Sequence, residues 1–206
     1  GFPADKISVK ANSILDPQPI SRIKPTNIQP FALYVGRISE EKGIDTLLKA
    51  WSTMAEQDLL KVAGTGPLEG LLTNKKNIET LGHQNSEIIS QLMEQARFLV
   101  LPSEWYEGFP LVLVEAFAHS LPVLASNLGS MADIIKDGET GVLFKPGDPI
   151  DLASKARWLL ENPQQTQKLG AKARLTFLEK YTSEQNYNEL MTIYKDAISY
   201  GKRVLY

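Results

Sequence analysis

Short apolar runs set between helical segments constrain the fold of this 206-residue chain more than any other feature. Six runs are predicted to be strands, at 31–35, 59–63, 77–81, 98–101, 122–125 and 141–144. The apolar runs lack polar–apolar alternation, as strands buried on both faces should. Helical spacing is clearest at 44–54, where apolar residues recur every three or four positions. This alternation predicts an α/β fold with a doubly wound, mostly parallel, Rossmann-like sheet and helices on both faces.

Local signals predict the remaining elements and the division of the chain. Ser86 is a candidate N-cap, and Pro110 suits the first position of a helix. Besides 44–54 and a short helix after the turn at 64–67, helices are predicted at 86–96, 112–119, 131–135 and from 149 onward, with breaks at 162–163 and 181–182. A short strand is expected at 6–9. We expect an interdomain connection and N-terminal edge at 1–30, a binding domain at 31–180 and a C-terminal helix at 181–206.

Composition excludes several classes of protein. The formal net charge of −2 argues against a general nucleic-acid binder. The absence of Cys rules out disulfides and thiol chemistry, and two distant histidines make a transition-metal site improbable. No run approaches the roughly 20 apolar residues of a membrane span, and the first residues lack the features of a signal peptide. We therefore expect a cytoplasmic protein.

The segment E-G-F-P-L-V-L-V-E carries two carboxylates, Glu107 in a loop after a strand and Glu115 about one turn inside the next helix. The N–H groups of Leu111 and Val112 at the helix start predict an anion site. Together these features suggest a polyol attached to a phosphate. The alternatives are plain surface charge and the paired carboxylates of a hydrolase. The apolar neighbours of Glu115 argue for burial of that carboxylate.

Strand ends bring further candidates to the same edge of the sheet, where such folds bind ligands. Arg37 and Lys42 could clamp a diphosphate, or they could pair with Glu40 and Glu41 in a solvated turn. Gly36, Gly64 and Gly66 permit close backbone approach. The dinucleotide fingerprint G-x-G-x-x-G fails because position 69 is Glu, and the phosphate-binding loop pattern is absent.

Histidines and aromatic residues allow more than one interpretation. His83 is predicted to be a polar loop residue, with contact to a ligand as the alternative. His119 is predicted to cap a helix end, where positive charge is favoured. Trp51 and Trp158 fall in apolar helical patterns and are predicted to be core. Trp105 and Tyr106 lie in the loop before Glu107, where they either shape a sugar pocket or cover the loop.

In order along the chain, these motifs resemble the C-terminal, donor-binding domain of a retaining GT-B glycosyltransferase of family four, the group 1 glycosyltransferases. The resemblance rests on Tyr34-Val35-Gly36-Arg37, Glu41-Lys42-Gly43, Val62-Ala63-Gly64-Thr65-Gly66-Pro67, Leu81-Gly82, Leu101-Pro102-Ser103, the segment 107–115, Pro122-Val123 and Asp137-Gly138 to Gly141. It implies one half of a GT-B architecture. It departs from the family at Ser13, where Gly often follows Asn12.

The resemblance implies a role for each candidate residue. Arg37 and Lys42 would bind the donor diphosphate and the developing charge of the leaving group, and Glu107 would face the donor sugar. Glu115 would hold the ribose hydroxyls. The remaining donor-binding candidates are near the sugar, the phosphates or the base: Gly36, Gly64, Gly66, His83, Gln84, Gly108, Phe109 and Leu111.

The resemblance also implies a reaction and its partners. The reaction is transfer of a hexosyl group from a nucleoside-diphosphate sugar, with retention and without a metal or other cofactor. The acceptor, a glycan or lipid-linked sugar, would bind an N-terminal domain outside this chain, so the chain alone is expected to be inactive. A full-length protein could contact the inner membrane face peripherally and serve polysaccharide synthesis. The alternatives are a non-catalytic nucleotide-sugar-binding module and, less favoured, a dinucleotide-dependent oxidoreductase domain.

Overall fold

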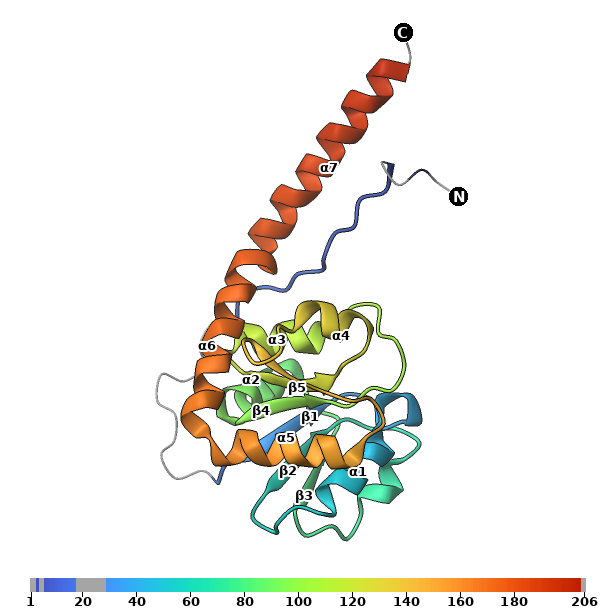
Figure 1. Cartoon of the computed structure of the whole chain (residues 1–206). Coiled ribbons are helices and arrows are strands. Elements are labelled where there is room, and N and C mark those ends of the chain that lie inside the picture. The colour runs from blue at the N-terminus through green and yellow to red at the C-terminus, as the bar shows by residue number, and fades with distance from the viewer. Residues whose placement is uncertain (1–2, 4–5, 18–28, 205–206) are drawn as a thin grey trace.

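The computed structural model describes residues 3, 6–17 and 29–204, and its centre is a six-stranded sheet (Figure 1). The strand order is β3-β2-β1-β4-β5-β6, and every neighbouring pair is parallel. The strands are β1 (Phe31–Val35), β2 (Leu59–Ala63), β3 (Ile78–Gly82), β4 (Phe98–Leu101), β5 (Val123–Ser126) and β6 (Gly141–Phe144). The predicted α/β, Rossmann-like sheet is confirmed. The order reverses between β1 and β4, which is the position where this fold binds ligands.

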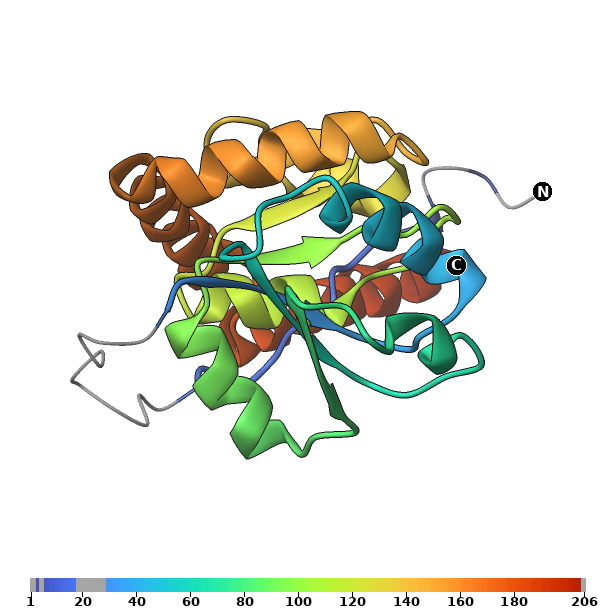
Figure 2. The same ribbon diagram turned by 90° about the horizontal axis from the view of Figure 1, so that it is seen from below.

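Helices cover both faces of the sheet. They are η2 (Glu40–Lys42), α1 (Ile44–Trp51), η3 (Glu69–Leu72), α2 (Ser86–Gln95), α3 (Leu111–Ala118), α4 (Gly129–Ile134), α5 (Pro149–Glu161), α6 (Pro163–Lys180) and α7 (Ser183–Val204). Alternate residues of β1 enter different cores: Phe31 and Leu33 pack with α2, α3 and α4, whereas Ala32 and Tyr34 pack with α1 and α5. Figure 2 shows the sheet between these layers. Burial on both faces explains the continuous apolar runs.

Four local predictions need correction. No strand forms at 6–9, because no neighbouring strand pairs with it. The N-cap of α2 is Asn85, whose side chain accepts a hydrogen bond from Ile88 N at 2.9 Å, rather than Ser86. Pro110 is the N-cap of α3 rather than its first helical residue, and α3 begins at Leu111, one residue before the predicted range 112–119. Trp51 is fully buried, but Trp158 is 44% exposed and is not core.

The N-terminal segment lies against the junction of α6 and α7, from which α7 extends away from the sheet (Figure 1). Ile14 N donates to Tyr181 O at 3.3 Å, and Asp16 forms a two-pronged ion pair with Arg174 at 2.6 and 2.8 Å. The helix breaks at 162–163 and 181–182 are confirmed. Of the expected connection at 1–30, the part at 18–28 lies outside the described residues. None of the described helices is long and apolar enough to cross a membrane.

Candidate functional site

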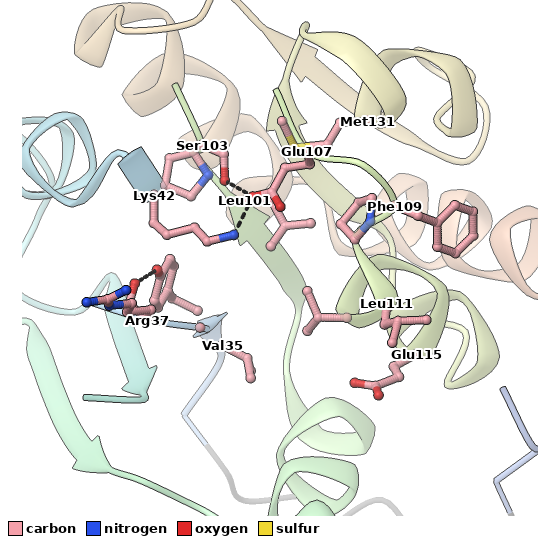
Figure 3. Close-up of a pocket in the computed structure, with 15 residues that line it drawn as sticks. Val35, Arg37, Lys42, Leu101, Ser103, Glu107, Phe109, Leu111, Glu115 and Met131 are labelled. Atoms are coloured by element: carbon pink, nitrogen blue, oxygen red, sulfur yellow. Dashed lines mark hydrogen bonds and ion pairs between the residues drawn. The ribbon is translucent and has the colours of Figure 1, made fainter. Parts of the chain in front are cut away.

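Two adjoining pockets lie at the carboxyl ends of the strands, and both are lined by Val35, Gly36 and Arg37. The first has a volume of about 430 Å³ and is drawn in Figure 3; the second has a volume of about 470 Å³. The predicted site residues that line the first pocket are Gly36, Arg37, Lys42, Glu107, Phe109, Leu111 and Glu115. Those that line the second are Gly36, Arg37, Gly64, Gly66, His83 and Gln84. Gly108 is not among the lining residues of either pocket.

Three hydrogen bonds hold Glu107, two at its carboxylate and one at its main-chain carbonyl. Its Oε1 accepts from Lys42 Nζ at 2.5 Å and from Ser103 Oγ at 2.7 Å (Figure 3). Its main-chain carbonyl accepts from Ser130 Oγ, at 2.8 Å, on α4. The donors from η2 and from the end of β4 hold the carboxylate, and the donor from α4 holds the backbone of the same residue.

The ion pairs expected for a solvated charged turn at 36–42 do not form for Lys42. Lys42 pairs with Glu107 rather than with Glu40 or Glu41. Glu41 instead accepts a hydrogen bond from Ser39 Oγ at 2.7 Å, which lowers its pKa, and Arg37 and Lys42 lower that pKa further. Among the described residues the Arg37 guanidinium has no ion pair or side-chain hydrogen bond, and it points away from Lys42 (Figure 3). The site therefore holds one paired and one unpaired cation.

Two glycines bring the site loops into direct contact. At Gly43, φ is +70° and an added Cβ would lie 1.8 Å from the carbonyl oxygen of Pro102. At Gly64, φ is +149° and an added Cβ would lie 1.8 Å from the carbonyl oxygen of Gly36. Any side chain at either position would push the loops apart, because backbone atoms cannot yield as a flexible side chain can. The contact at Gly43 joins the cationic turn to the carboxylate loop, and the contact at Gly64 joins the loops after β1 and β2.

Tyr34 fixes the backbone that carries Arg37. Its hydroxyl donates to the carbonyl oxygen of Arg37 at 2.6 Å, and its ring is almost fully buried. Burial raises the pKa of Tyr34, and the negative charges of Glu107 and Glu41 raise it further. The phenol therefore stays protonated at neutral pH and remains a hydrogen-bond donor.

Glu115 lies on α3 with its carboxylate pointing toward the side of the pocket that Val35 lines (Figure 3). The residue is partly buried, and desolvation raises the pKa of its carboxyl group. The Glu115 carboxylate has no hydrogen bond or ion pair with any residue that the structure describes. The expected burial is thus partial, and the carboxylate is an unpaired acceptor at the pocket wall.

His83 and Gln84 line the second pocket and not the first. His83 is exposed there, and Gln84 Nε2 donates to the carbonyl oxygen of Leu81 at 2.5 Å. This bond uses the amide nitrogen. Among the described residues the amide oxygen, Gln84 Oε1, has no partner and is available as an acceptor. Trp105 and Tyr106 are 68% and 82% exposed and line neither pocket, which favours the second of their two interpretations, that they cover the loop.

His119 lies outside both pockets. It occupies the C-cap position of α3 as predicted, and its Nε2 is 2.9 Å from Ser90 Oγ. Burial lowers the pKa of this imidazole, so it is mainly neutral at pH 7.

Sequence reasoning missed Ser103, which lines the first pocket, and the contact between Thr46 and Glu104, which lies outside both pockets. Thr46 Oγ1 donates to Glu104 Oε1 at 2.6 Å, and Glu104 N donates to Glu41 O at 3.0 Å. Nothing in the sequence connects these segments, which are 58 residues or more apart. In the described part of the chain, no three His, Asp or Glu side chains gather to form a metal site.

Comparison with known proteins identifies the family. The family model described as glycosyl transferases group 1 matches residues 20–176. The chain belongs to the group 1 glycosyltransferases. An uncharacterized glycosyltransferase of Methanocaldococcus jannaschii is 32% identical over 172 residues, covering 81% of this chain and 48% of that protein.

Two solved structures share the fold. Sucrose-phosphate synthase from Thermosynechococcus elongatus superposes with a TM-score of 0.76 at 29% identity, over 83% of this chain and 46% of that one. Anabaena HepE in complex with UDP superposes with a TM-score of 0.73 at 22% identity, over 82% and 48%. This group 1 domain spans about half the length of these proteins.

Proposed function

We propose that this domain binds the nucleotide-sugar donor of a hexosyltransferase. The observation that carries the proposal is the meeting of Arg37, Lys42, Glu107 and Glu115 around joined pockets at the strand ends of a group 1 domain. HepE has been solved with UDP and with UDP-glucose, which supports a uridine nucleotide as the first candidate.

In this proposal each pocket residue contacts one part of the donor. Arg37 and Lys42 bind the diphosphate, together with the N–H groups at the start of α3. Glu115, an acceptor without a partner among the described residues, takes the ribose hydroxyls. Glu107 faces the transferred sugar. His83 and Gln84 border the base, and the backbone at Gly36, Gly64, Gly66, Phe109 and Leu111 completes the surface around sugar and phosphates. Gly108, which lines neither pocket, is left without a contact to the donor.

Catalysis depends on stabilising the departing nucleoside diphosphate. In this proposal Lys42 and the amides of α3 stabilise the negative charge that accumulates on the diphosphate, and Arg37 joins them once its guanidinium turns toward the bound donor. We propose that transfer proceeds with retention and without a metal ion. The acceptor, a glycan or a lipid-linked sugar, binds a second domain, so this chain alone binds donor without appreciable turnover. We also propose a cytoplasmic location, with peripheral membrane contact in a full-length protein.

A ligand screen tests the donor proposal. Thermal stability of the chain would be measured with UDP, GDP and ADP, with their sugars, and with NAD. We expect one nucleoside diphosphate and its sugar to raise the melting temperature, because a ligand that binds only the folded state stabilises it. NAD should have no effect. Stabilisation by NAD alone would favour an oxidoreductase, and no stabilisation by any nucleotide would overturn the proposal.

A transfer assay separates the enzyme from a non-catalytic binding module. The chain joined to an acceptor-binding domain of a group 1 relative would be tested for release of the nucleoside diphosphate. Release that depends on Arg37 and Lys42 supports the enzyme. Tight donor binding with no release in any such assembly would favour the binding module.

A further inference from the structure

Glu107 is held asymmetrically, because both of its side-chain hydrogen bonds end on the same oxygen. Lys42 Nζ and Ser103 Oγ converge on Oε1, whereas Oε2 has no partner among the described residues. The carboxylate lines the first pocket. One oxygen is therefore anchored and the other is left to accept a hydrogen bond from a ligand.

The two anchors differ in what a bound donor would do to them. Lys42 has a long, flexible type of side chain that is 31% exposed, and a diphosphate would compete with Glu107 for its ammonium group. Ser103 is 4% exposed and lies directly after Pro102, the residue whose carbonyl contacts Gly43. Its short side chain cannot follow a ligand. Ser103 is thus the anchor that stays in place when Lys42 turns toward phosphate.

We propose that Ser103 is a positioning residue that orients Glu107 toward the transferred sugar. It keeps Oε1 fixed, so that Oε2 meets a sugar hydroxyl, and it thereby sets the preference for the nucleotide sugar over the plain nucleoside diphosphate. This inference rests on the proposed donor function. Removing the Ser103 hydroxyl should affect binding of the sugar alone. This hydroxyl donates to Glu107, and among the described residues it has no hydrogen bond to Lys42 through which it could affect the phosphates.

A purely structural role for Ser103 would look different. Thr46 provides the matched control, because it also donates a short hydrogen bond to a carboxylate of this loop, that of Glu104, without contacting Glu107. If Ser103 only stiffens the loop, removing either hydroxyl should have the same consequence. If Ser103 acts through Glu107, only its own removal should affect sugar recognition.

The test is titration calorimetry of the chain with UDP-glucose and UDP, or with the matching pair that the screen selects. We expect Ser103→Ala to weaken the nucleotide sugar roughly 3- to 10-fold, the range of one lost hydrogen bond, and the nucleoside diphosphate less than about 2-fold. Ser103→Thr, which keeps the hydroxyl, should restore most of the difference. Thr46→Val should leave the ratio of the two affinities unchanged.

A double-mutant cycle completes the test. In a Glu107→Ala background, Ser103→Ala should cause no further loss of sugar affinity. Equal losses for both ligands, an equal effect of Thr46→Val, or an undiminished effect without Glu107 would each overturn the inference while leaving the donor function intact. Failure of the unmodified chain to bind any nucleotide would instead overturn the donor function, and this inference with it.

Discussion

Lys42 and Glu107 are 65 residues apart in the sequence, yet their charged groups are 2.5 Å apart in the first pocket. Both side chains are partly exposed, at 31% and 21%, so solvent screens the pair and its contribution to stability is small. A pair that contributes little to folding can still hold charge ready for a ligand. We therefore expect the pair between Lys42 and Glu107 to matter more for ligand binding than for stability.

At the residue scale, Lys42→Ala should weaken binding of the nucleoside diphosphate by roughly 1.5–3 kcal/mol, the range of a charge-assisted hydrogen bond. The free energy of unfolding should fall by no more than about 1 kcal/mol. Calorimetry and urea denaturation measure the two quantities. Lys49→Ala is the control, because Lys49 forms a 2.5 Å ion pair with Asp45 outside both pockets. Equal losses of affinity in the two variants would contradict the assignment.

Glu115 gives a pH-dependent prediction. Desolvation raises its pKa in the folded state, so the native protein holds this proton more tightly than the unfolded chain does. By linkage, its contribution to stability falls as pH rises from the ordinary carboxyl pKa through the raised folded value. Glu115→Gln should therefore melt higher than the unmodified chain at pH 7 and equally at pH 4 or below, while binding the nucleoside diphosphate more weakly. A variant that melts lower at pH 7 would contradict this account.

At the element scale, the loop after β1 and the loop after β4 form one unit, because Gly43 lies directly on the Pro102 carbonyl. Glu104 N adds a hydrogen bond to Glu41 O, and Thr46 donates to the Glu104 carboxylate. These contacts place Lys42 within reach of Glu107. The geometry of the site thus depends on packing between two connections rather than on either one alone.

Gly43→Ala tests this packing against a matched glycine. Gly138 has nearly the same φ, +72° against +70°, but an added Cβ there meets nothing within 4 Å. Gly138→Ala should cost about 1–2 kcal/mol of stability, the conformational term alone. Gly43→Ala should cost clearly more, because it adds a backbone clash, and it should weaken donor binding. Urea midpoints measure the stability; equal costs would mean that the contact with Pro102 is unimportant.

The sequence predicts the elements unevenly, for physical reasons. Strand positions are right to within one residue, since burial on both faces leaves a continuous apolar signal. Helix starts are less certain, because Asn85 and Ser86 are equally good caps until the bond to Ile88 N is known. The strand expected at 6–9 fails since a strand exists only with a neighbour to pair with. The prediction that Trp158 is core is wrong because periodicity identifies an apolar helix face but not whether another element packs against it.

The site was predictable as a location but not as a set of bonds. The rule that parallel strands end at one edge brings Arg37, Glu107 and Glu115 together. The choice of Glu107 over Glu41 as the partner of Lys42 depends on the separation of two loops, which no local pattern encodes. Ser103 resembles any loop serine in the sequence. Its role follows only from the position of its hydroxyl.

At the scale of the whole molecule, Arg174 fastens the N-terminal segment to the helices that leave the sheet. It pairs with Asp16 and donates to the carbonyl oxygen of Ala118 at 2.8 Å. Arg174→Ala should speed amide hydrogen exchange in the segment 11–16 at least several-fold and leave nucleotide affinity unchanged. Exchange detected by mass spectrometry checks the first effect and calorimetry the second. Unchanged exchange would show that other contacts hold the segment.

The central claim is that the joined pockets bind a nucleotide sugar in one orientation. The most direct measurement is a crystal structure of the chain with UDP-glucose, or with whichever nucleotide sugar the thermal screen selects. The account predicts the diphosphate within hydrogen-bond distance of Arg37 and Lys42, the ribose hydroxyls on Glu115 and the hexose beside Glu107. A nucleotide bound elsewhere, or bound here with its phosphates away from both cations, would contradict it.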